Sequence, residues 1–117
     1  MKVVEFTPLA CKKEGALITG TIKLKMPSFT DKCELASKLE LQLDDSGKVS
    51  LGSGDMFMKI SKIVNASKDN ILSVDMKYKD GSAELKSFDD LNNDDNGGEI
   101  LTEVATILIN GFSASKN

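Results

Sequence analysis

Histidine, arginine and tryptophan are all absent from this chain, and all fifteen basic residues are lysines. Histidine is the commonest general base in enzymes and the commonest protein ligand of transition metals, so its absence removes the usual centre of both chemistries. Arginine makes the bidentate contacts that recognise phosphate, carboxylate and guanine, and lysine cannot make them. We therefore expect a protein that is not an enzyme and that uses no cofactor and no metal.

A strong positive charge and long hydrophobic runs are also missing. The formal net charge is −3, whereas nucleic-acid binding usually needs a clustered positive face. No apolar run approaches the roughly 20 residues of a membrane span, and the N-terminus lacks the apolar core of a signal peptide. These absences predict a soluble, intracellular protein that has neither nucleic acid nor membrane as a partner.

Cysteine is scarce, and the two residues present, Cys11 and Cys33, cannot form a zinc site alone. Their spacing matches no redox motif, so we interpret both as buried or half-buried free thiols, with a single disulfide as the alternative. Lys12 and Lys13 would lower the pKa of an exposed Cys11 thiol, which leaves a cysteine nucleophile as an alternative. A structural cysteine at the end of a strand is the favoured interpretation.

The residues that are present suffice for a hydrophobic core. About 40% of the 117 residues are hydrophobic, which is enough for one domain of this size. Strand and helix patterns both occur along the chain. The sequence therefore predicts a single α+β domain over residues 1–112, with two β-hairpins in an antiparallel sheet packed by about three α-helices. Residues 113–117 are expected to be a frayed tail.

Two strands are predicted near the N-terminus. Residues 3–7 are short and β-branched, and Pro8 ends that strand or places it at a sheet edge. Residues 17–26, LITGTIKLKM, alternate cleanly between apolar and polar positions, which is typical of a strand with one face on a core. The apolar face contains Ile18, Gly20, Ile22, Leu24 and Met26.

Two helices should follow these strands. Ser28 and Asp31 resemble a capping box, which predicts a helix from residue 29 to about 40 with Phe29, Cys33, Ala36 and Leu39 or Leu43 on one apolar stripe. Residues 44–55 carry three glycines and predict a flexible loop. Asp55 is placed to cap a second helix that ends near residue 66. Its apolar side contains Met56, Phe57, Ile60, Ile63 and Val64.

The segment from 72 to 88 predicts a hairpin, because Asp80-Gly81 is a strong two-residue turn signal between alternating flanks. Counting outward from this turn brings apolar residues together on one face and opposite charges together on the other. Each cross-strand charge pair contributes roughly 0.2–1 kcal/mol. The predicted pairs are Tyr78 with Ala83, Met76 with Leu85, Lys77 with Glu84, and Asp75 with Lys86.

The stretch NNDDNGGEILTE, residues 92–103, has the ligand spacing of a calcium-binding EF-hand loop. The pattern would use Asn92, Asp94, Asn96 and Glu103, with Gly97 at the sharp turn. The hairpin, however, makes most of residues 83–91 a strand where an EF-hand needs a helix, with a helix lined by Leu85, Phe88 and Leu91 as the alternative. The first ligand also lacks a carboxylate. We therefore interpret the stretch as a mobile acidic connector, and keep a single calcium site as an alternative.

A strongly apolar helix is predicted over residues 99–112, EILTEVATILINGF, with Asn110-Gly111 as its end. A helix this apolar is either buried or becomes buried when a partner binds. We expect the partner surface at the exposed part of this helix together with the second helix. The residues expected there are Leu101, Ile109, Phe112, Met56 and Phe57.

The segments ITGTIKLKMPSFTDKCELASKL, VDMKYKDGSAELKSFDDL and EILTEVATILINGF, taken in this order, resemble the small tail assembly chaperones of phages. They cover about half of the chain, and the likeness consists of hydrophobic patterning and turn chemistry. The resemblance implies a non-enzymatic protein of the host cytoplasm that binds the tape measure protein. It also implies recruitment of tail tube subunits, so the major tail protein is a second expected partner.

Other small acidic proteins share these features. A secretion chaperone, another protein-binding adaptor, or a tail-completion or tube component would equally lack catalytic residues. Gene order separates these hypotheses, because a tail assembly chaperone is expected between the genes of the major tail protein and the tape measure protein.

Overall fold

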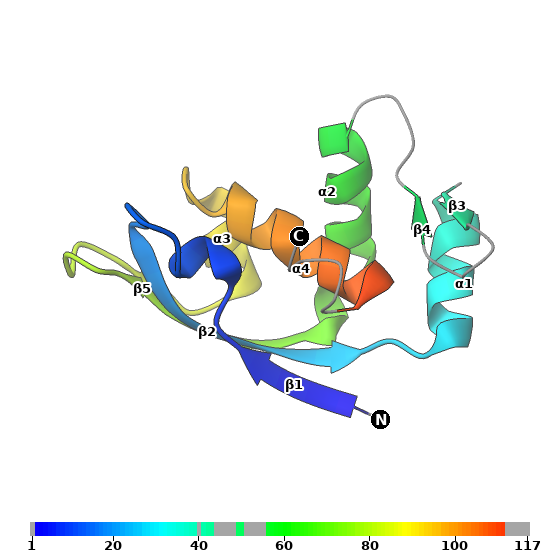
Figure 1. The fold of residues 1–117 in the computed structure, drawn as a ribbon, viewed down its shortest axis with the longest axis horizontal. Coiled ribbons are helices and arrows are strands. Elements are labelled where there is room, and N and C mark those ends of the chain that lie inside the picture. The colour runs from blue at the N-terminus through cyan, green and yellow to red at the C-terminus, as the bar shows by residue number, and fades with distance from the viewer. Residues whose placement is uncertain (1, 40, 44–48, 51–55, 112–117) are drawn as a thin grey trace.

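A four-stranded antiparallel sheet with helices on one of its faces makes up most of the fold (Figure 1). The computed structural model describes residues 2–39, 41–43, 49–50 and 56–111. The strands lie in the order β1 (Lys2–Phe6), β2 (Ile18–Met26), β5 (Ile71–Tyr78) and β6 (Glu84–Leu85). The α-helices are α1 (Phe29–Lys38), α2 (Met56–Ala66), α3 (Phe88–Asn93) and α4 (Gly98–Asn110). This arrangement confirms the predicted α+β fold.

The N-terminal strands follow the predicted alternation. β1 lies at the edge of the sheet and pairs with β2 from Lys2 opposite Met26 to Phe6 opposite Ile22. Ile22 and Leu24 are almost completely buried beneath the helices, whereas the lysines of β2 lie on the other face. Between the two strands, Leu9–Cys11 forms a short 3-10 helix, η1.

The second hairpin has the predicted register. Met76 lies opposite Leu85, and Lys77 lies opposite Glu84. The remaining predicted pairs are also present, since the backbone N–H of Tyr78 donates to the carbonyl of Ala83 at 2.9 Å and the Lys86 ammonium pairs with Asp75. Apolar alternation and charge pairing in the sequence therefore predicted the register of this hairpin correctly.

The turn of this hairpin is not the predicted two-residue turn. The Gly81 N–H donates to the Tyr78 carbonyl at 3.0 Å, so Lys79 and Asp80 occupy the centre of the turn. Gly81 then has a φ of +79°, a left-handed conformation that glycine adopts without the steric cost of a side chain. The loop is longer than predicted by one residue on each side, Lys79 and Ser82, so Tyr78 still lies opposite Ala83 and the pairing register is unchanged.

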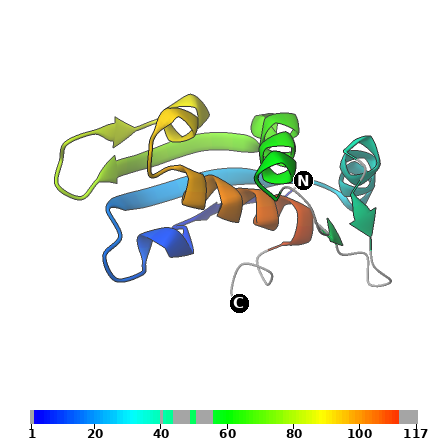
Figure 2. The same ribbon diagram turned by 90° about the horizontal axis from the view of Figure 1, so that it is seen from above.

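Three helices cover one face of the sheet and create the core. Figure 2 shows α4 running along the sheet, with α2 and α3 beside it. α4 is almost wholly apolar on its inner sides, and its buried residues are Ile100, Leu101, Val104, Ala105, Ile107, Leu108 and Ile109. The predicted last helix is therefore confirmed within the described residues, and it packs in this chain's own core.

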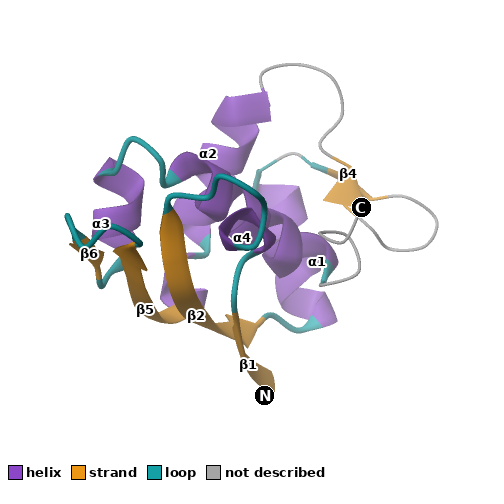
Figure 3. Cartoon of the chain, turned by 60° about the vertical axis from the view of Figure 1, so that its left-hand side comes forward, coloured by secondary structure: helices purple, strands orange, loops and turns teal. Residues whose placement is uncertain are grey.

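α1 lies beyond one end of the sheet (Figures 1 and 3), beside a two-stranded sheet of β3 (Gln42–Leu43) and β4 (Val49–Ser50). Its capping box is present: the Ser28 hydroxyl accepts from the Asp31 N–H at 3.1 Å, and the Asp31 carboxylate accepts from the Ser28 N–H at 3.4 Å. Ala36 is buried, but Phe29 is 64% exposed, so its predicted place on the packed stripe is wrong. Phe29 is the first residue of the helix, and its side chain is left largely in solvent.

Two other expectations need correction. Residues 83–91 are not mostly a strand, because β6 is short and α3 begins at Phe88. The reason is local: the Ser87 hydroxyl accepts from the Asp90 N–H at 3.1 Å, and the Asp90 carboxylate accepts from the Lys86 N–H at 2.9 Å. Within the predicted loop 44–55, residues 49–50 form β4, while the rest of that loop and the Asp55 cap lie outside the described residues.

The part of the chain that the structure describes contains no helix that is both long and apolar enough to cross a bilayer.

Candidate functional site

A groove of about 400 Å³ lies between α2 and the first turns of α4. Its floor is apolar, because Val64 and Leu101 are buried there and Ile60 is half-buried. Its polar rim is lined by Ser61, Asn65, Asn92 and Thr102, and Gly98 and Glu99 line it at the start of α4. We call this feature, with these lining residues, the groove.

The local sequence explains why the groove is open. Ile60, Ile63 and Val64 share the helical spacing that predicted an apolar side for α2. Ile63 is fully buried in the core, whereas Ile60 is turned to the groove and keeps part of its surface exposed. Opposite it, α4 begins with Gly98, which has no side chain to fill the space. The core therefore covers only part of the apolar side of α2, and the part that carries Ile60 is left open to the groove.

The residues expected to bind a partner are not exposed together. Leu101 is 7% exposed and Ile109 is 2% exposed, so the prediction that they form an exposed part of the last helix is wrong. Both pack into this chain's core, because the sheet and α2 already cover the apolar side of α4. Phe112 and the side chains of Met56 and Phe57 lie outside the described residues. Of the two whose side chains the structure describes, Leu101 lines the groove and Ile109 does not.

The polar groups of the groove rim are largely bonded within their own helices. The Asn65 amide donates to the Ser61 carbonyl at 2.9 Å, and the Thr102 hydroxyl donates to the Gly98 carbonyl at 2.8 Å. Among the described lining residues, Glu99 is the one charged side chain, and it is paired with Lys13. The groove therefore suits an apolar side chain better than a charged ligand.

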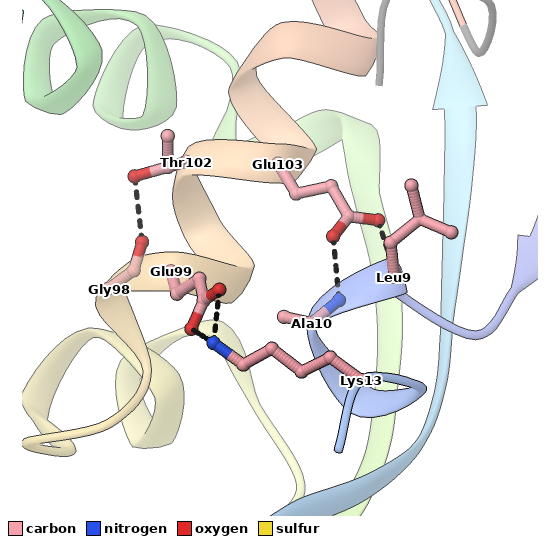
Figure 4. A network of polar contacts seen from close by, with 7 residues as sticks. All are labelled: Leu9, Ala10, Lys13, Gly98, Glu99, Thr102 and Glu103. Carbon is pink, nitrogen blue, oxygen red and sulfur yellow. Dashed lines mark hydrogen bonds and ion pairs between the residues drawn. The ribbon is translucent and has the colours of Figure 1, made fainter. Parts of the chain in front are cut away.

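Two carboxylates of α4 hold the segment between β1 and β2 (Figure 4). Glu103 accepts from the backbone N–H of Leu9 at 2.7 Å and from that of Ala10 at 3.1 Å. Glu99 accepts from the Lys13 ammonium at 2.7 Å through both of its oxygens. Glu99 and Glu103 lie one helical turn apart, so both face the same side of α4.

The calcium-loop spacing is not realised as a loop. Asn92 belongs to α3, and Glu103 lies well inside α4. Glu103 is already bonded to η1, and Asp94 accepts from the Tyr78 hydroxyl at 2.6 Å. Among the described residues, no three or more His, Cys, Asp or Glu side chains are grouped to hold a metal ion. The predicted acidic connector is confined to the short turn between the two helices.

That turn is tied to the hairpin by Tyr78. The Asn96 amide donates to the Tyr78 hydroxyl at 2.9 Å, and the Asn96 N–H donates to the Asp94 carboxylate at 2.9 Å. The Asn96 bond lowers the pKa of Tyr78, but the bond to Asp94, desolvation and the acidic charges nearby outweigh it, so the pKa is raised overall. These bonds fix the approach to α4.

Cys11 does not have the setting of a nucleophile. The residue is buried, and its pKa is raised by burial and by the charge of Glu103, against a smaller lowering by Lys79. Lys13, which was expected to favour the thiolate, is paired with Glu99 instead. Both Cys11 and Cys33 are free thiols, and Cys33 is half-buried, as the favoured interpretation predicted.

The sequence placed Ile60 and Val64 on the apolar side of the second helix and Leu101 in the expected partner surface, but the part played by Glu99 and Thr102 of α4 was missed. Both Glu99 and Glu103 lie in the predicted helix 99–112, but their four-residue spacing, which puts them on one face of that helix, was not used. Neither the backbone partners of Glu103 at Leu9 and Ala10 nor the Lys13 partner of Glu99 could be read from a local pattern. In comparisons with known proteins, no family model, no curated protein and no solved structure matches this chain.

Proposed function

We propose that the chain is a non-enzymatic chaperone of phage tail assembly that holds an apolar helical segment of the tape measure protein in the groove. The observation that carries this proposal is the apolar floor of Ile60, Val64 and Leu101 beneath a rim whose polar groups are bonded internally. Such a surface favours an aliphatic or aromatic side chain of another protein. The hydrophobic pattern that resembles phage tail assembly chaperones supplies the expected partner.

The size of the groove suits reversible binding. A helix lying in a groove presents side chains at positions i, i+3 or i+4, and i+7. A volume of about 400 Å³ has room for only a few such side chains. Each fully buried leucine or phenylalanine contributes about 1.5–3 kcal/mol, before the cost of ordering the two proteins is subtracted. Binding of this strength keeps an apolar helix in solution and still lets the growing tail tube displace the chaperone.

The major tail protein is the second partner in this proposal. It must use a surface other than the groove, because the chaperone has to hold the tape measure protein while tube subunits are recruited. Both interactions would take place in the host cytoplasm, before the tube polymerises.

Co-expression with the tape measure protein of the same phage tests the proposal. We expect the tape measure protein to stay in the soluble fraction and to co-purify with this chain. Ser61→Glu places a carboxylate at the exposed rim of the groove and should reduce co-purification at least about tenfold, because a charge facing an apolar partner must be desolvated.

Ser73→Glu is the matched control, since Ser73 is also exposed but lies on β5, away from the groove lining. This variant should bind like the unchanged protein. A tape measure protein that sediments in the presence of the unchanged chain would contradict the chaperone role. Equal binding by both variants would remove the groove from the proposal.

A further inference from the structure

The segment that joins β1 to β2 lies against α4 without filling the space beneath it. Residues 8–17, which we call the strap, include η1 and the turn after it. A pocket of about 290 Å³, open to solvent, lies between the strap and the start of α4. Its lining is apolar at Leu17, Ile18 and Ile100 and polar at Lys13, Asn96 and Glu99. Protein interiors are normally close-packed, so this contact gains less dispersion energy than a core contact does.

Polar bonds hold the strap in place. The Glu103 carboxylate binds the N–H groups of Leu9 and Ala10, which are the first donors of η1. The second attachment is the Lys13–Glu99 ion pair, whose side chains are 53% and 58% exposed. Exposed ion pairs contribute little, typically less than about 1 kcal/mol. At its far end, the Leu17 carbonyl accepts from the Lys79 N–H at 2.9 Å, which joins the strap to the end of the second hairpin and not to α4. The attachment of the strap to α4 therefore depends mainly on Glu103.

The apolar side chains of the strap are divided between the interior and the solvent. Pro8 is fully buried and Cys11 is 6% exposed, whereas Leu9 is 40% and Leu17 is 56% exposed. Segments with few buried apolar contacts open locally at a lower free energy than the whole domain unfolds. The sheet does not depend on the strap, because β1 and β2 are paired along their own length.

We propose that the strap opens from α4 as a local unit while the sheet stays folded, and that Glu99 and Glu103 act as its latch. Opening uncovers Cys11 and the side of α4 that carries Ile100. Glu99 also lines the groove, so the two sides of α4 share one residue. If the groove holds a helix of the tape measure protein, as the proposed function states, a lysine or arginine of that helix competes with Lys13 for Glu99. Loss of the Lys13–Glu99 ion pair then favours the open strap.

Amide hydrogen exchange measured by NMR at increasing urea concentration tests strap opening without any partner. The reporters are the N–H groups of Leu9 and Ala10, bonded to Glu103, and those of Cys11 and Lys12, bonded within the strap. We expect these amides to exchange by openings with little urea dependence, and the amides of β2 to exchange only by global unfolding. Equal urea dependence for strap and sheet would overturn the proposal.

Variants of the latch give the second test. Lys13→Gln should raise the exchange rate of the strap amides about threefold, as expected for loss of an exposed ion pair. Glu103→Gln should raise it about tenfold, because a charged acceptor of two backbone donors becomes neutral. Lys12→Gln, at an exposed neighbouring lysine, should change nothing.

The pattern of exchange decides the result. Faster exchange confined to the strap amides supports the latch, whereas an equal increase throughout the sheet means that the variants only lower global stability. Lys13→Gln changes an exposed side chain, so the test stands if Glu103→Gln does not fold. These experiments use the protein without a partner, so they test strap opening independently of whether the groove binds the tape measure protein.

Discussion

The hydroxyl of Tyr78 donates a hydrogen bond of 2.6 Å to the carboxylate of Asp94, so the end of β5 is tied to the turn that precedes α4. Tyr78 is the only tyrosine in the chain, so its ionisation can be followed by ultraviolet absorbance without overlap. Its pKa in the folded protein is raised. The folded state therefore retains the phenol proton at pH values where the unfolded chain begins to lose it.

The first prediction concerns stability at high pH. A group whose folded-state pKa is raised contributes stability that is fully present below its unfolded pKa of about 10 and is lost as pH rises through the folded value. Urea unfolding should therefore show the difference between the unchanged protein and Tyr78→Phe shrinking across that window. A difference that grows with pH would contradict the assignment, and the comparison of the two proteins removes the effect of lysine titration.

The second prediction concerns the turn before α4. A Cβ atom at Gly97 would lie 2.0 Å from the Leu91 carbonyl oxygen, although Gly97 has an ordinary φ of −81°. Gly97→Ala should therefore cost about 1–3 kcal/mol of unfolding free energy through steric overlap alone. At Gly98 an added Cβ meets nothing within 4 Å, so Gly98→Ala should stabilise the protein by up to about 1 kcal/mol. Thermal unfolding of the two variants tests this prediction. Similar melting temperatures for Gly97→Ala and Gly98→Ala would contradict the predicted steric overlap at Gly97.

The third prediction separates core from partner surface at Leu101. Because Leu101 is 7% exposed, Leu101→Asp places a carboxylate against the core. We expect at least about 3 kcal/mol of destabilisation, and unfolding at moderate temperature, measured by circular dichroism. A well-folded Leu101→Asp variant that loses only partner binding would instead restore Leu101 as a surface residue.

The fourth prediction concerns the start of α1. Ser28→Ala removes the hydroxyl that accepts from the Asp31 N–H and should destabilise α1 by about 1 kcal/mol. Hydrogen exchange of the α1 amides is the appropriate measurement, since α1 lies beyond the end of the sheet. Ser37→Ala, in the interior of the same helix, should have no such cost, because alanine is the better helix former. Slower exchange in Ser28→Ala than in Ser37→Ala would exclude the capping role.

Local chemistry made much of this fold predictable. The register from Met76 to Leu85 follows from alternation around one turn, and the capping box at Ser28 needs only residues that are close in sequence. The turn type at Gly81 was missed because a glycine next to aspartate fits more than one hairpin turn. α3 was missed because the Ser87 cap lies only two residues after a strand residue, where the strand pattern dominated.

The candidate site was much less predictable, because it depends on contacts between distant segments. An apolar helix shows in sequence that Leu101 and Ile109 must be covered, but not whether this chain or another protein covers them. In the structure both are buried in the hydrophobic core of this chain. The bond from Leu9 to Glu103 joins residues that are 94 positions apart, and no periodic pattern records such a pair.

The edge position of β1 has a consequence for solubility. β1 has a neighbouring strand in the four-stranded sheet on one side only, so its outer backbone groups are a template on which another chain can add a strand. Lys2 and Glu5 are exposed on this short strand, and Pro8 follows soon after its end. Charged side chains, a short length and a nearby proline are the means by which natural sheets discourage edge-to-edge aggregation. The border of the sheet is thus protected against fibre growth at high concentration by residues that have no part in the groove.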